Sequence, residues 1–167
     1  AALTAAAQDS RIRGLILLDP MLDTYDTMAR GTVAAAGFPL ALAHVTTTAA
    51  GLLHGAPAFD TTLKDQGMTY ARPTLLIQDE RDPVNRRIHA EEIVAANRNI
   101  DLWVAPHPAE DHPLLAAAGG WGTHVAAFQL YPDEVAALLD AYLTMVHAIC
   151  DAEDLEAAAS VPLAGAR

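Results

Sequence analysis

The chain has 167 residues, of which 52% are hydrophobic and 19% charged, and its formal net charge is −11. This length allows one compact domain with its own core, and the composition is not that of a disordered chain. The negative charge argues against a nucleic acid or an anionic membrane as partner. The single cysteine, Cys150, excludes an internal disulfide and a zinc site built from cysteines.

The first apolar segments predict a helix and then a strand. Residues 1–8 are typical of the end of a helix, and they have no basic segment that would mark a signal peptide. Because the chain also lacks an initiator Met, we expect it to begin inside a longer domain. The apolar run RGLILLDP, residues 13–20, predicts a strand that is buried on both faces and paired on both sides.

Residues 22–56 predict helical fragments with breaks at 37–39 and 51–57. From 31 to 59 the sequence has no Asp, Glu, Lys or Arg, which is long enough for a membrane span. Glycines, prolines and histidines interrupt this stretch, so we predict two short apolar helices that cover another part of the molecule instead of a span. The lone cysteine fits a reducing compartment, and we expect a cytoplasmic protein.

Two further strands follow, with a helix between them. PTLLIQ, residues 73–78, and IDLWVAP, residues 100–106, predict buried strands. Residues 86–97 predict the helix. Its apolar face is expected to contain Ile88, Ile93 and Val94.

The last predicted helix begins at Pro132, a favourable residue for a first helical turn. Asp133 and Glu134 then place negative charge at the positive end of the helix dipole. Apolar residues recur at helical spacing after Val135, so we expect this helix to pack on a sheet. Residues 151–167 are expected to be a weakly structured tail.

Alternating strands and helices predict an α/β fold with a parallel sheet. In such sheets the functional groups gather at the carboxyl ends of the strands. Asp19, Asp82 and the segment 107–124 are all expected at that edge. The segment contains three histidines: His107, His112 and His124.

A strand that ends in DERDPV, then a helix, a strand, a loop, Gly-x-His and a closing helix resembles the C-terminal half of the α/β-hydrolase fold. The resemblance implies a serine, histidine and acid triad in which a buried carboxylate orients the imidazole. The acid would be Asp82, with Asp79 as the alternative. The histidine would be His124, which the closing helix follows, with His112 as the alternative nearer the third strand.

The resemblance also implies what surrounds these residues. Residues 1–150 would be part of a hydrolase domain, with 21–70 as a cap over the active site, and the substrate would carry an apolar acyl or alcohol group. The motif Gly-x-Ser-x-Gly does not occur, and neither Ser10 nor Ser160 has its strand-to-helix context. The nucleophile is therefore expected upstream, and this chain alone should be inactive. No cofactor is expected.

Two other functions compete with this interpretation. Asp79, Asp82, His107, His112 and His124 could bind zinc or manganese in a metal hydrolase, although no HExxH pair is present. A non-catalytic α/β module that binds a ligand or partner is the other alternative. A chelator would separate the first alternative from a serine hydrolase, and labelling with a fluorophosphonate would separate the second.

Overall fold

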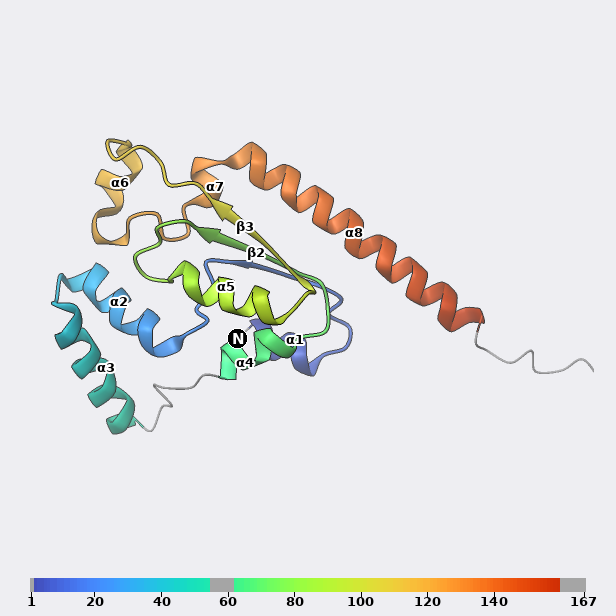
Figure 1. Cartoon of the computed structure of the whole chain (residues 1–167), viewed down its shortest axis with the longest axis horizontal. Helices are drawn as coiled ribbons and strands as arrows, with labels where there is room; N and C mark the ends of the chain where they lie inside the picture. Colours follow the sequence, from blue (N-terminus) through green and yellow to red (C-terminus); the bar gives the residue numbers. More distant parts are fainter. Residues whose placement is uncertain (1, 55–61, 160–167) are drawn as a thin grey trace, which may run out of the picture. The chain divides into compact units, whose positions relative to one another are not determined.

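The computed structural model describes residues 2–54 and 62–159, and Figure 1 shows their helices and strands. Three strands form one parallel sheet in the order β1 (Leu15–Leu18), β2 (Thr74–Asp79), β3 (Ile100–Ala105). The predicted parallel α/β fold and the positions of its strands are confirmed. Every residue of β2 is buried, because β2 is the central strand and elements cover both its faces.

The first strand differs from its prediction. Among the described residues β1 pairs with β2 alone, so it forms an edge of the sheet. Leu17 is buried, but the Ile16 side chain is 39% exposed. An apolar run is thus compatible with a strand that is covered on one face only. The described sheet therefore has an apolar strand at one edge.

Three helices pack with the sheet around one core. They are α1 (Ala2–Gln8), α4 (Thr62–Thr69) and α5 (Arg87–Ala96). Their core includes Leu3, Leu17, Tyr70, Leu76 and Ile93. The predicted helix at 86–97 is confirmed, with Asn97 as its cap.

The prediction that Ile88 lies on the apolar face of α5 is wrong. Ile88 is 45% exposed, whereas His89, Ala90 and Ile93 are buried. Ile88 and Ile93 are five residues apart, and a helix brings residues three or four apart onto one face. The buried face therefore follows Ile93 and excludes Ile88.

The helices α2 (Thr24–Ala36) and α3 (Leu40–His54) form an antiparallel pair beside the sheet (Figure 1). The predicted break at 37–39 is confirmed: Gly37 ends α2 in a left-handed conformation. The break predicted at 51–57 is wrong for residues 51–54, because α3 continues through Gly51 to His54. One interior glycine costs a helix only about 1 kcal/mol. Residues 55–57 lie outside the described residues.

Short helices occupy much of the segment that was expected to be a loop. They are α6 (Pro113–Ala118), the 3₁₀ turn η1 (Gly119–Trp121) and α7 (Ala127–Leu130). Gly120 of η1 lies against α2. A Cβ atom at Gly120 would be 2.5 Å from the carbonyl oxygen of Ala34. This segment therefore crosses α2 at backbone contact distance.

The helix α8 (Pro132–Ala159) makes up a second unit, which begins at Asp133. Its start at Pro132 is confirmed. It continues through residues 151–159 of the expected tail. Residues Pro132–Asp154 are long and apolar enough to cross a membrane, which is weak support for a span because core helices of soluble proteins meet the same criterion. Its packing on the sheet stays a prediction.

Candidate active site

Four ionisable side chains meet at the carboxyl edge of the sheet. Asp19 follows β1, Asp79 ends β2, Asp82 lies in the turn after β2, and His124 follows η1. The backbone N–H of Asp19 still donates to the carbonyl of Ile77 at 2.8 Å, so β1 and β2 hold the first two residues in register. The sheet thus brings together residues that are far apart in the sequence.

Asp82 and His124 are in direct contact. His124 Nδ1 lies 2.9 Å from Asp82 Oδ2. The Asp82 side chain has no exposed surface, and that of His124 is 19% exposed. The other carboxylate oxygen, Oδ1, accepts from the backbone N–H groups of Val84 at 2.7 Å and Asn85 at 2.9 Å. The predicted contact is confirmed, and the catalytic role of the two residues stays a prediction.

The backbone around His124 allows this contact because Gly122 has a positive φ of 53°. A Cβ atom at Gly122 would be 3.3 Å from Cγ of Pro83, the residue after Asp82. The histidine segment therefore packs closely on the acid turn. The Trp121 ring lies 5.6 Å from the His124 ring, centroid to centroid.

The alternative residues have other contacts. His112 is the N-cap of α6, where its Nδ1 accepts from the N–H of Leu114 at 3.2 Å. The backbone N–H of His107 donates to Glu80 Oε2 at 3.0 Å. Asp79 Oδ2 accepts from the N–H of Ala126 at 3.1 Å.

The arrangement of Asp19 was not foreseen from the sequence. Asp19 is 3% exposed, and its carboxylate accepts from the N–H of Asp79 at 2.7 Å and from the N–H of Val125 at 2.9 Å. Asp19 directly follows the apolar strand β1, and Asp82 lies three residues after the end of β2, although proline follows each of them. No local sequence pattern marks the hydrogen bonds of Asp19 with Asp79 and Val125.

The electrostatics of the site follow from burial and from these contacts. The hydrogen bond to Asp82 raises the pKa of His124, against the opposite effect of burial. Burial and the neighbouring charge of Asp79 raise the pKa of Asp19 to about 8, and burial raises the pKa of Asp79 to about 6. Three carboxyl groups cannot all be charged at low cost in so small a buried space. The site therefore retains protons near neutral pH.

The residue after His124 has a strained backbone. Val125 has φ of 54°, a left-handed conformation that is an outlier for a β-branched residue. Such a conformation costs about 1–2 kcal/mol. Strain of this kind persists where surrounding contacts hold it, and it clusters at functional sites.

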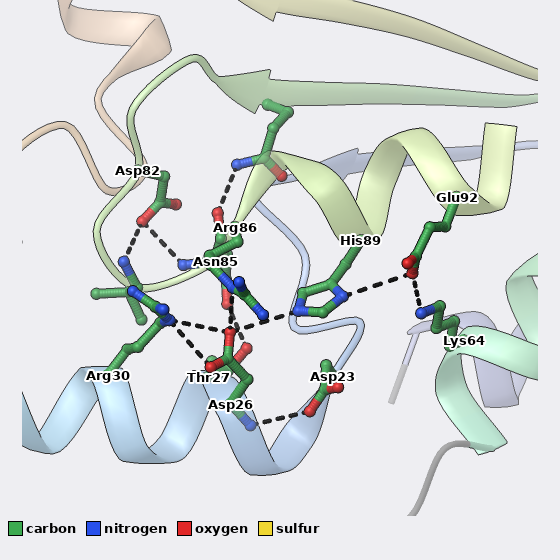
Figure 2. A network of polar contacts seen from close by, with 12 residues as sticks. Asp23, Asp26, Thr27, Arg30, Lys64, Asp82, Asn85, Arg86, His89 and Glu92 are labelled. Atoms are coloured by element: carbon green, nitrogen blue, oxygen red, sulfur yellow. Dashed lines mark hydrogen bonds and ion pairs between the residues drawn. The ribbon is translucent and has the colours of Figure 1, made fainter. Parts of the chain in front are cut away.

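A polar network fixes the acid turn to α2, as Figure 2 shows. Asn85 donates its backbone N–H to Asp82, and its side-chain oxygen accepts from Thr27 Oγ1 at 2.7 Å. Its side-chain nitrogen donates to the Asp19 carbonyl. Asn85 thereby contacts the ends of both β1 and β2 and the helix α2.

Asp26 of α2 is the centre of the second part of this network (Figure 2). It accepts from Arg30 Nε at 2.9 Å and from Arg86 Nε at 2.7 Å, and His89 Nε2 lies 3.4 Å away. Burial acts to raise the pKa of Asp26, but the hydrogen bonds and charges of Arg86 and Arg30 lower it below its ordinary value. These bonds to Asp26 thus join α2, the first helix of the expected cap, to the turn that carries Asp82.

A metal ion has one candidate position among the described residues. Potential ligand atoms of Asp19, Asp82 and His124 lie within 4.8 Å of one another. Both carboxylates already accept from backbone N–H groups, and Asp82 also contacts the imidazole. A cation would compete with these hydrogen bonds, so the residues are better suited to an acid–base pair.

A depression of about 280 Å³ opens beside His124. Leu114, Ala117 and Ala118 form part of its wall, and Val125 and Ala126 another part. His124 and Gln129 add polar groups to the wall, which therefore combines apolar and polar surface as small-molecule sites do. Ser10, in contrast, lines a cavity with Ala71 and Arg72, just before the start of β2 and thus at the opposite edge of the sheet.

No family model and no curated protein matches this sequence. Solved structures of an esterase from Pyrococcus furiosus, Pf2001, in three crystal forms do match, with TM-scores of 0.58, 0.57 and 0.55 at 19%, 20% and 19% identity. Each match covers 86% of this chain and 48% of the esterase chain. The chain thus spans about half the length of that esterase, and at this identity the likeness shows that it shares the α/β fold of the part that it covers.

Proposed function

We propose that this chain supplies the acid and the base of an esterase-like serine hydrolase of the α/β-hydrolase superfamily. The observation that carries the proposal is the 2.9 Å contact between buried Asp82 and His124 at the carboxyl edge of a parallel sheet. The shared fold with an esterase supports it. The serine nucleophile and the oxyanion donors would lie upstream of these residues.

The contact suits a defined proton transfer. With Nδ1–H donated to Asp82, His124 has a free lone pair on Nε2 and can accept the proton of a serine hydroxyl. The serine oxygen then attacks the ester carbonyl, and the imidazolium returns the proton to the departing alcohol. Water, activated by the same imidazole, releases the acid from the acyl-enzyme. Asp82 stabilises the imidazolium during both steps without becoming protonated.

The surroundings of His124 favour an apolar substrate group. The depression beside it is lined by Leu114 and by several alanines. The pair of helices α2 and α3 would act as a cap, and it is joined to the acid turn through Thr27 and Asn85. Burial of an acyl chain or an apolar alcohol in such a pocket would contribute about 25 cal/mol per Å².

Ester turnover tests the proposal. We expect the 167-residue chain alone to be inactive, and the same chain extended by its encoded upstream residues to hydrolyse short aryl esters. His124→Ala should reduce kcat of the extended protein by about 10³-fold or more, by the loss of its general base. His112→Ala is the matched control and should retain activity.

Three outcomes would point to another function. Turnover by the 167-residue chain that survives His124→Ala would place the chemistry on other residues. Loss of turnover on treatment with a chelator would favour a metal at Asp19, Asp82 and His124. An extended protein that neither hydrolyses esters nor reacts with a fluorophosphonate would favour a binding module.

A further inference from the structure

The segment that carries His124 is held at its far side by two buried carboxyl groups. Asp19 Oδ2 accepts from the N–H of Val125 at 2.9 Å, and Asp79 Oδ2 accepts from the N–H of Ala126 at 3.1 Å. The two N–H groups belong to the residues directly after His124. Asp82 holds the imidazole itself, so the histidine is fixed from both its side chain and its backbone.

The backbone conformation of Val125 requires such a contact. Its φ of 54° is unfavourable for valine, and its side chain is 47% exposed, so packing of the side chain does not explain the conformation. The described hydrogen bond of its N–H goes to Asp19. A strained residue persists where its surroundings over-determine it.

Asp19 also makes hydrogen bonds to the sheet, so it can fix the segment of His124 relative to β1 and β2. Its N–H bonds to Ile77 of β2, and its Oδ1 accepts from the N–H of Asp79 at 2.7 Å. One carboxyl group therefore joins the ends of β1 and β2 to the segment of His124. No other described carboxylate makes hydrogen bonds to both β2 and this segment through its two oxygens.

We propose that Asp19 is a positioning residue that holds Val125 in its left-handed conformation and so directs the His124 imidazole toward Asp82. The inference rests on the proposed function in that His124 is the proposed base. It assigns to Asp19 no contact with a substrate. Asp79 supports the same segment one residue further along, through Ala126.

The test compares Asp19→Ala with Asp101→Asn, an exposed aspartate on β3, in the ¹⁵N-labelled 167-residue chain. Hydrogen exchange of the Val125 amide should accelerate roughly 10- to 100-fold in Asp19→Ala, the effect of leaving a buried N–H without its hydrogen-bond acceptor. The His124 Nδ1 proton resonance should weaken or disappear. Neither should change in Asp101→Asn.

A rescue variant distinguishes positioning from a general loss of stability. Val125→Gly removes the strain, because glycine adopts this φ without cost. The Nδ1 proton resonance of His124 should therefore return in Asp19→Ala/Val125→Gly. If Asp19→Ala does not fold, Asp19→Asn, which keeps one acceptor oxygen, is compared with and without Val125→Gly in the same way.

Unchanged Val125 exchange and an unchanged His124 resonance in the Asp19 variants would overturn the inference. Failure of Val125→Gly to restore the resonance would also overturn it, since Asp19 would then act by another route. These readouts do not depend on ester hydrolysis. The turnover experiment can therefore contradict the proposed function while the NMR experiment supports the positioning role of Asp19. The turnover experiment can also support the proposed function while the NMR experiment contradicts that role.

Discussion

Asp19, Asp79 and Asp82 are buried within one small volume, and hydrogen bonds from backbone N–H groups stabilise their carboxyl groups there. Burial of an unpaired charge would be strongly unfavourable. Asp82 has the imidazole of His124 as an additional partner. Asp19 forms no described ion pair within 4.0 Å, and burial together with the charge of Asp79 raises its pKa to about 8.

The raised pKa of Asp19 predicts how stability depends on pH. Between its ordinary value of 3.8 and about 8, the native state binds more protons at this residue than the unfolded state does. The contribution of Asp19 to stability is therefore complete below about pH 4 and is lost as the pH rises to about 8. We expect the free energy of unfolding in urea to fall by a few kcal/mol over this window, to order of magnitude.

Asp19→Asn should flatten this pH dependence, because asparagine does not titrate. Asp101→Asn is the matched control and should retain the slope of the wild-type chain. The explanation fails if the two variants show the same decline between pH 5 and pH 8.

At the scale of elements, the position of η1 depends on its close approach to α2. Gly120→Ala would place a methyl group 2.5 Å from the Ala34 carbonyl oxygen, so η1 must move away from the helix. We expect a loss of about 1–3 kcal/mol in the free energy of unfolding, the usual cost of overpacking. In the extended protein, ester turnover should also fall, because His124 lies three residues after the end of η1.

Gly31→Ala is the matched control for Gly120→Ala. A Cβ atom at Gly31 would meet nothing closer than 4.0 Å, and Gly31 lies inside α2. Alanine there should be neutral or stabilising by up to about 1 kcal/mol, since it favours a helix over glycine. Equal losses in the two variants would show that the approach of η1 to α2 does not matter.

The sequence predicts the strands and α5 well because each has a simple apolar pattern of the expected length. It also predicts the contact between Asp82 and His124, through the order of motifs around them. The contact of Asp19 with Val125 joins residues 106 positions apart in the sequence, and no local pattern encodes such a pairing. The prediction that Ile88 is buried was wrong because helix geometry puts it on another face than Ile93. The prediction of a break at Gly51 was wrong because the neighbouring residues favour a helix more than one glycine disfavours it.

At the scale of the whole molecule, apolar surface remains exposed in the described structure. Ile16 lies on the edge strand β1, and Leu52 and Leu53 of α3 are 77% and 82% exposed. An apolar strand edge with unpaired backbone groups is a route to association with another chain. The net charge of −11 opposes such association through mutual repulsion.

Ile16→Lys tests whether the β1 edge drives association. A lysine on an edge strand disfavours pairing with a second strand. We expect sedimentation velocity of the 167-residue chain to show less concentration-dependent association in this variant. Ile88→Lys changes the net charge equally at an exposed helical isoleucine and should leave association unchanged. Equal effects of both variants would attribute the association to net charge.

An NMR titration of the His124 imidazole measures whether Asp82 holds this histidine as the proposed function requires. In the wild-type chain the pKa of His124 should lie above its ordinary value of 6.5, because of the hydrogen bond to Asp82. Asp82→Asn should lower that pKa toward its ordinary value, because the hydrogen bond and the charge of Asp82 both raise it, and should remove the Nδ1 proton resonance. A smaller fall is expected from Asp19→Asn, because the charge of Asp19 also raises the pKa of His124. A His124 pKa that is the same in Asp82→Asn and in the wild-type chain would show that Asp82 does not hold the imidazole.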